Sequence, residues 1–225
     1  MIWLFAIITG LIIFAPGLWV KHVMDSHREA RSDFPGTGGE LARHLLDTHG
    51  LGNVAVEITP HADHYDPERK VVALTTKNHD EPSVTAVAVA AHEVGHALQD
   101  QQGYAPLKLR QRMVKTAAVT DRIGSLALFA MSMLGSVVVS PRLLIAGVAA
   151  VVLMGTIRVI VHLITLPMEI DASFKRALPI LINGQYLPQE DIPAARSVLK
   201  AAAYTYVAGS LIQILNLFRF FRYFR

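Results

Sequence analysis

The residues best suited to chemistry are two histidines one helical turn apart, in the sequence HEVGH at residues 92–96. They fall within a run, residues 83–101, that predicts a single helix, so His92 and His96 share one face. Two imidazoles placed in this way can bind one Zn²⁺, and Glu93 then lies beside the metal-bound water as a general base. The motif therefore predicts metal-assisted hydrolysis, usually of a peptide bond.

A motif this short also arises by chance on helices that carry two ordinary histidines. The preceding residues, 84–91, are small and mainly apolar on every side, which is typical of a helix buried on most faces. Burying two histidines and a glutamate in such a helix is costly unless a metal compensates their polar groups. Gly95 costs about 1 kcal/mol of helix propensity relative to alanine, which is tolerable where another element approaches closely. Ser83 predicts the N-cap of this helix.

A zinc hydrolase needs a third protein ligand and keeps the fourth position open for water. The position six residues beyond His96 is Gln102 rather than histidine, which excludes the metzincin subclass. A carboxylate from a second helix is expected instead, and the downstream candidates are Asp100, Asp121, Glu169 and Asp171. Glu169 is favoured as the ligand because it directly follows a long apolar run, and His162 is the reserve. Asp171 is expected to hold an imidazole N–H or the helix itself. The alternative is that Glu169 and Asp171 only cap the next helix.

Long apolar stretches predict a membrane protein, since 52% of the residues are hydrophobic. Three of them, Ile2–Val20, Ile123–Ser140 and Leu143–Leu166, suit the thickness of a bilayer core. A cleaved signal peptide fits the first poorly, because no basic stretch precedes it. A weaker stretch, Ala201–Phe218, predicts either a fourth span or an amphipathic surface helix.

Basic residues flank the predicted spans and predict their orientation. The positive-inside rule is satisfied if the N-terminus is outside and residues 21–116 are in the cytoplasm, together with Glu169. The metal-binding candidates then lie on one side, as a single site requires. The three arginines after residue 218 break the rule if the last stretch spans. Arg158 and His162, four apart in the third span, are either functional or reach toward the interface.

Composition also excludes several functions. Without cysteine the chain can form no disulfide and carries no thiol nucleophile. The net charge of +3 is modest, and its basic residues lie at membrane edges rather than in an aromatic-interleaved patch, so nucleic-acid binding is not expected. Nothing in the sequence indicates an oligomeric state.

Between the first span and the HEVGH helix, the sequence predicts a small catalytic core. Residues 37–40 match a capping box that starts a helix ending near Gly50. Residues 54–59 and 71–76 are β-rich and predict strands, the second of them an edge strand that would hold a peptide substrate. The loop at residues 61–67 contains two histidines and two aspartates. It could bind a second metal, but a solvated turn is the preferred interpretation.

Longer motifs carry a resemblance to a known family. They are residues 65–67 (YDP) with Lys70, residues 83–99 (SVTAVAVAAHEVGHALQ) and residues 167–173 (PMEIDAS). Over nearly its whole length, the chain resembles the YugP-like membrane zinc metallopeptidases, which are neutral zinc metallopeptidases. More distantly, it resembles gluzincin membrane proteases of the HtpX and CAAX-prenyl-protease type. The resemblance implies a bacterial inner-membrane protease that acts on a peptide or membrane-protein substrate.

In those distant relatives, a Glu-x-x-Ala-Asp helix completes the zinc site. The resemblance therefore implies Glu169 as the third ligand. Here Ser173 replaces the usual aspartate, and Asp171 is the expected substitute.

We therefore expect a mainly α integral membrane protein, with a helical zincin-like core, a small β-sheet and three to four transmembrane helices. Its parts are an N-terminal span (1–20), a zinc-peptidase core (21–116), a transmembrane hairpin (117–166), a helix carrying the third ligand (167–200) and a membrane-associated C-terminal helix (201–225).

The predicted activity is that of a membrane-embedded zinc endopeptidase. Glu93 would act as general base, and Arg176, with Tyr104 as second choice, would stabilise the oxyanion. One alternative is a non-proteolytic scaffold or chaperone-like protein whose structural zinc has a fourth protein ligand. A membrane metal transporter is less attractive, because its spans would carry too few ionisable groups.

Overall fold

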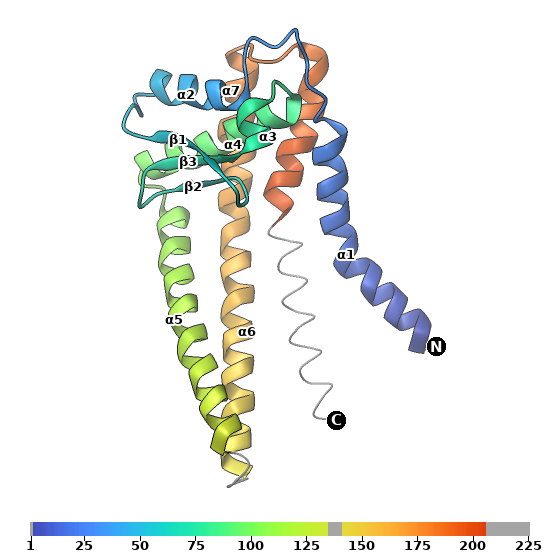
Figure 1. Ribbon diagram of the computed structural model, residues 1–225, viewed down its shortest axis with the longest axis vertical. Helices are drawn as coiled ribbons and strands as arrows, with labels where there is room; N and C mark the ends of the chain where they lie inside the picture. The colour runs from blue at the N-terminus through green and yellow to red at the C-terminus, as the bar shows by residue number, and fades with distance from the viewer. Residues whose placement is uncertain (1, 135–140, 206–225) are drawn as a thin grey trace.

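The computed structural model describes residues 2–134 and 141–205. A head of short helices and a small sheet sits at one end, and the long helices extend from it (Figure 1). In chain order the elements are α1 (Ile2–Ser26), α2 (Gly38–Thr48), β1 (Ala55–Thr59), β2 (His64–Asp66), β3 (Val71–Thr75), α3 (Thr76–Asp80), α4 (Val84–Gln101), α5 (Ala105–Leu134), α6 (Pro141–Ile170), the π-helix η1 (Asp171–Ala177), α7 (Leu178–Asn183) and the 3₁₀ turn η2 (Gln189–Asp191). Residues 192–205 are again helical.

Helix α2 begins where the capping box predicts. The hydroxyl of Thr37 accepts a hydrogen bond from the backbone N–H of Glu40, and the Glu40 carboxylate accepts one from the Thr37 N–H. Beyond the helix, Gly50 has a φ of +70°, a conformation that favours glycine. Helix α2 packs its apolar face against α4.

The sheet differs from the sequence-based expectation. Its order is β1-β3-β2, with β1 parallel and β2 antiparallel to β3. The prediction of residues 71–76 as an edge strand is therefore wrong, since β3 is central and Val71–Leu74 is buried. The unpredicted strand β2 formed in the polar loop, where Tyr65 alone is buried and its hydroxyl donates to Asp100. A strand with one apolar residue gives little hydrophobic alternation to detect.

Helix α4 is the centre of the head. The Ser83 hydroxyl accepts from the backbone N–H of Ala86, which confirms the predicted N-cap. Every residue from 84 to 99 is buried. Helix α2, the sheet, α3 and η1 all contact α4, so a helix of small side chains is surrounded by protein.

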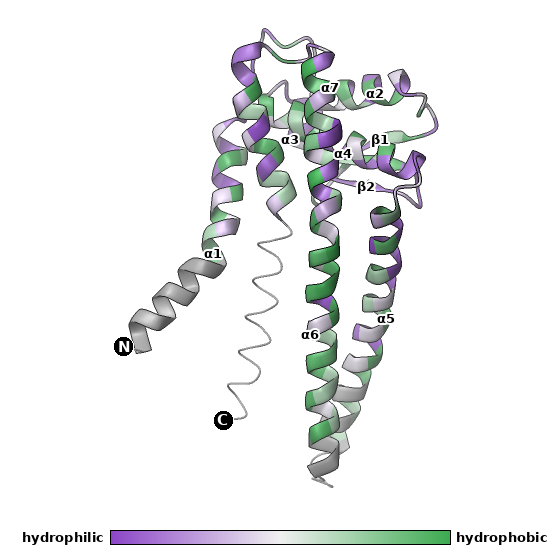
Figure 2. Ribbon diagram, turned by 180° about the vertical axis from the view of Figure 1, so that it is seen from behind, coloured by the Kyte–Doolittle hydropathy of each residue, from purple (hydrophilic) through white to green (hydrophobic). Residues whose placement is uncertain are grey.

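Helices α5 and α6 lie side by side as a hairpin (Figure 1). The guanidinium of Arg158 on α6 donates to Asp121 on α5, at 2.7 and 3.1 Å. Their outer faces expose large apolar side chains, among them Val119, Ile123, Leu126, Phe129, Met133, Ile145, Leu153, Ile160 and Leu163. Figure 2 shows the apolar character of α6 along most of its length.

Within the described part of the chain, one helix, Ile145–Asn183, has the length and composition to cross a membrane. The predicted number of three to four spans stays a prediction. Residues 135–140, at the end of the predicted span Ile123–Ser140, and 206–225, in the predicted C-terminal helix, lie outside the described residues, as does the side chain of His162.

Helix α6 continues without interruption through Pro167 into η1 and α7. The end of α6 carries Glu169 into the head, where the following η1 packs against α4. A π-helix such as η1 is uncommon and frequently occurs at functional sites. Residues 192–205 pack on this region through Ala195, Val198 and Leu199, all fully buried.

Candidate metal centre

The three predicted ligands meet at one point. Nε2 of His92 and Nε2 of His96 each lie 3.1 Å from the same oxygen, Oε2 of Glu169. The potential ligand atoms of the three residues are all within 4.8 Å of one another. All three side chains are buried, Glu169 almost completely at 1% exposed. Two residues of α4 and one of α6 thus form the group that the HEVGH spacing and the downstream glutamate predict.

Ser173 holds His92 from the opposite side of the ring. Its hydroxyl lies 3.0 Å from Nδ1 of His92 and donates to the backbone oxygen of Leu199 at 3.1 Å. Because the hydroxyl proton is used by Leu199, Nδ1 of His92 must be the donor in the first bond. Nε2 then carries the lone pair that a metal requires.

Gln99 orients the ring of His96 in the same way as Ser173 orients that of His92. Nδ1 of His96 lies 2.9 Å from Oε1 of Gln99, and the amide nitrogen of Gln99 donates to both the backbone oxygen of Met168 and Asp171, each at 2.9 Å. Since the amide oxygen can only accept, Nδ1 of His96 donates to it. Both histidines are thus oriented with Nε2 toward Glu169.

The donor set fits zinc. Oε1 of Glu169 is buried and has no hydrogen-bond partner among the described residues, which is unfavourable unless another group compensates it. Two imidazole nitrogens and one carboxylate are the ligands of gluzincin-type catalytic zinc sites, and they leave a fourth position for water. Asp171, a possible fourth ligand of a structural site, is instead bonded to Gln99 and Arg176.

Glu93 lies within the HEVGH motif and is buried, at 6% exposed. Burial raises the pKa of its carboxyl, while the neighbouring His92 and His96 oppose this increase. For His96, burial lowers the pKa, but the carboxylate of Glu169 outweighs it and raises the pKa to about 9. These directions apply to the metal-free protein, in which His96 holds a proton that a metal ion would displace.

Gly95 marks the point where α4 and η1 touch. A Cβ atom on Gly95 would lie 2.9 Å from the backbone oxygen of Ala172, closer than real side chains come. The expectation that this glycine permits a close approach is therefore confirmed. The contact sets Glu169 one turn from the crossing point, opposite the two histidines.

The other predicted residues have different partners. Asp171 binds no imidazole directly, because Ser173 and Gln99 take those positions, and it acts through Gln99 instead. Asp100 accepts from Tyr65 and Lys70, so it fixes β2 and the following turn rather than the metal. Sequence reasoning missed both Gln99 and Ser173. A glutamine in a run of buried small residues was the one signal that could have found the first.

The polar loop contains strand β2 instead of the expected solvated turn, and its histidines and aspartates form no metal-binding group. Asp63 accepts from the backbone N–H of Thr75 and from the side chain of Asn78. Asp66 accepts from two backbone N–H groups of the turn that follows it, and His64 bonds to a local carbonyl. The described residues contain no metal-binding group other than His92, His96 and Glu169.

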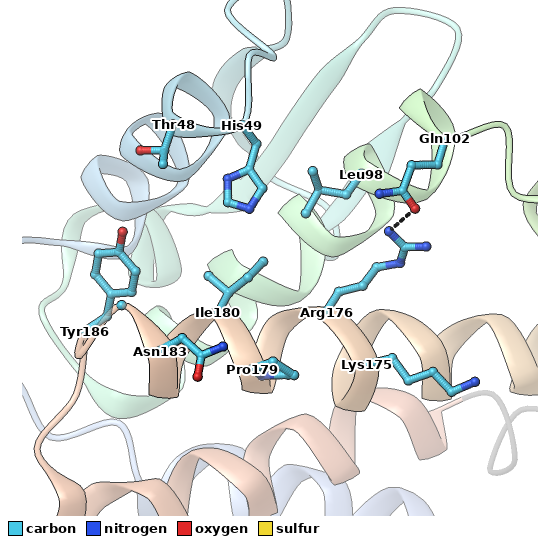
Figure 3. A pocket seen from close by; sticks show the side chains of 11 residues that line it. Thr48, His49, Leu98, Gln102, Lys175, Arg176, Pro179, Ile180, Asn183 and Tyr186 are labelled. Atoms are coloured by element: carbon cyan, nitrogen blue, oxygen red, sulfur yellow. Dashed lines mark hydrogen bonds between the residues drawn. The ribbon is translucent and has the colours of Figure 1, made fainter.

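Arg176 lies behind His96, away from Nε2. Its Nε donates to Asp171 at 2.8 Å and its Nη1 donates to Gln102 at 2.8 Å. The side chain borders a cavity of about 480 Å³ between the ends of α2 and α4 and the start of α7 (Figure 3). The guanidinium also lies 5.7 Å from the ring of Tyr104. These contacts lead away from the metal-facing side, so the oxyanion role of either residue stays a prediction.

Together, a buried helix with two metal-facing histidines and a glutamate from a second helix define a zinc-peptidase class of site. The chain belongs to the family described as "Putative neutral zinc metallopeptidase", whose model matches residues 2–225. It is similar to the "Putative membrane protease YugP" of Bacillus subtilis (strain 168), with 34% identity over 223 residues that cover 98% of this chain and 95% of that protein. No solved structure matches the chain significantly.

Proposed function

We propose that the chain is a membrane-embedded, gluzincin-type zinc endopeptidase. The observation that carries this proposal is the convergence of two oriented Nε2 atoms on one oxygen of Glu169. A structural zinc would have a fourth protein ligand. The three-ligand group instead supports a site with an open position, which catalysis needs.

In this mechanism His92, His96 and Glu169 would hold the zinc. The bound ion would supply a Lewis acid that polarises the scissile carbonyl and lowers the pKa of water. Glu93 takes the proton of the attacking water and delivers it to the leaving amine. The buried surroundings of Glu93 favour this role, since desolvation makes its carboxylate a stronger base. Arg176 and Tyr104 remain the candidates for oxyanion stabilisation.

We further propose that the protein crosses the bacterial inner membrane several times, with the metal centre facing the cytoplasm. The ligand Glu169 lies on the candidate membrane-crossing helix itself, and the outer faces of α5 and α6 expose apolar side chains. The name of the Bacillus relative, a membrane protease, agrees with a membrane location. Its substrates would be peptides or membrane proteins. With β3 central, an extended substrate could pair only with β1 or β2.

Metal analysis tests the ligand set. We expect one zinc per chain in detergent-purified wild type by mass spectrometry, and its loss in Glu169→Ala. Glu190→Ala, an exposed glutamate in η2, is the matched control and should keep the metal. Asp171→Ala should also keep zinc, although more weakly bound. Wild type without zinc would remove the basis of the peptidase proposal and favour the scaffold alternative.

A further inference from the structure

The two zinc histidines are held in different ways. Ser173, which holds His92, is itself fixed by a backbone carbonyl, that of Leu199. Gln99, which holds His96, is fixed on one side by a backbone carbonyl and on the other by a side chain, Asp171. The second arrangement depends on further side chains, and it can therefore be altered or rescued by substitution.

The orientation of the Gln99 amide determines which nitrogen of His96 carries the ring proton. An amide can turn over, exchanging its oxygen and nitrogen with almost no change in shape. A turned Gln99 would direct an N–H at Nδ1 of His96, which would then have to accept. The ring proton would move to Nε2, on the side of Glu169, and this tautomer cannot bind a metal there.

Two acceptors prevent this turn. In the present orientation, the amide nitrogen faces the oxygen of Met168 and the carboxylate of Asp171, each at 2.9 Å. A turned amide would place its oxygen against both of them, in a fully buried position where the repulsion and the lost hydrogen bonds are costly. Asp171 is fixed in turn by Arg176, at 2.8 Å.

We propose that Gln99, Asp171 and Arg176 form an orienting relay, in which Gln99 is a positioning residue for the zinc. The relay keeps the Nε2 lone pair of His96 directed at the metal. An amide is required at position 99 because it must accept from His96 and donate to Asp171 at the same time. This proposal deepens the proposed function and rests on its zinc site.

Zinc affinity tests the relay directly. The dissociation constant is measured by competition with a chromophoric chelator on the full-length protein in detergent. We expect Gln99→Leu to weaken binding by about 10- to 100-fold, as for other groups that orient a metal ligand. Gln101→Leu, the same change at an exposed position of the same helix, should bind zinc as the wild type does.

Exchanging the amide and the carboxylate between positions 99 and 171 separates the orienting role of Gln99 from its packing. Gln99→Glu keeps an acceptor for His96 but sets a second carboxylate against Asp171, so affinity should fall. Adding Asp171→Asn removes the opposing carboxylate and lets position 171 donate to position 99, at the expense of the contact with Arg176, so the double variant should recover part of the loss. Packing alone predicts no such recovery, because all three proteins have nearly the same shape.

The outcomes separate a failure of the proposed zinc site from a failure of the relay. Wild type that binds no zinc contradicts the proposed function and the relay with it. Wild type that binds zinc, together with Gln99→Leu of equal affinity or a double variant no tighter than Gln99→Glu, contradicts the relay alone. If Gln99→Leu does not fold, the comparison of Gln99→Glu with the double variant still tests the relay, because both are nearly isosteric with the wild type.

Discussion

Helices α4 and α6 are both rich in apolar residues, and both contribute to the candidate metal-binding group of His92, His96 and Glu169, yet their surroundings are opposite. From residue 84 to 99, α4 is buried on all sides by the head. Along its described length α6 leaves large apolar side chains exposed, for example Leu153 at 57%, whereas Met168 and Glu169 at its end are buried. An apolar helix therefore does not reveal whether protein or lipid surrounds it. Their polar residues differ, because those of α4 up to residue 99 lie buried with His92 and His96, whereas α6 also carries the exposed Arg158, paired with Asp121.

The largest expected effect tests the catalytic side of α4. Glu93→Gln should lower peptidase activity by about 100- to 10,000-fold, because the general base is removed, and should leave zinc content unchanged. Cleavage of a quenched fluorescent peptide library in proteoliposomes provides the measurement, with Glu190→Gln as the matched control. Full proteolysis by Glu93→Gln would contradict the assigned mechanism.

The next effect tests the surroundings of α6. Leu153→Arg places a charge in the middle of the proposed span and should cost about 3 kcal/mol in membrane insertion. Leu109→Arg, also exposed but at the head end of α5, should insert normally. Insertion is measured by glycosylation mapping of the hairpin. Equal insertion of the two variants would show that α6 does not cross the bilayer.

A smaller effect tests the contact between the two helices. Gly95→Ala should destabilise the protein by about 1–3 kcal/mol, because the new methyl group would overlap the backbone oxygen of Ala172. Gly17→Ala, in α1 with no atom within 4 Å of the added group, should not lower stability. The midpoints of thermal unfolding in detergent compare the two. If Gly95→Ala is as stable as the wild type, α4 and η1 can move apart without loss of stability.

The smallest effect concerns the protonation of His96 in the metal-free protein. In the metal-free protein the pKa of His96 is raised to about 9, above its value in the unfolded chain. Its contribution to folding is therefore present below about pH 6.5 and is lost as pH rises to about 9. Zinc must displace this proton, so zinc affinity should rise by up to about tenfold per pH unit between pH 7 and 9. Calorimetry in buffers of different ionisation enthalpy measures the released proton. A pH-independent affinity with no proton release would contradict the charged His96.

Local patterns predicted the parts of this structure that depend on neighbours in sequence. The caps at Thr37 and Ser83, the face shared by His92 and His96, and the close approach at Gly95 are all confirmed. Each follows from side-chain chemistry within one or two helical turns.

Long-range contacts explain what sequence reasoning missed. Strand β2 exists because Tyr65 reaches Asp100 on α4 and because β3 offers a free edge, neither of which is visible locally. The π-helix η1 likewise forms where the chain beyond α6 packs against α4. The roles of Ser173 and Gln99 depend on that same meeting of helices.

The continuity of α6, η1 and α7 has a mechanical consequence. Residues Ile145–Asn183 form one helix of 39 residues, a rod about 58 Å long. Glu169 is fixed to this rod about 36 Å from Ile145, so a tilt of about 2° around that end displaces it by about 1 Å. A helix that spans a bilayer can tilt to match the thickness of that bilayer. If α6 crosses a membrane as proposed, a change of tilt would reach Glu169 through a continuous helix rather than through a flexible linker.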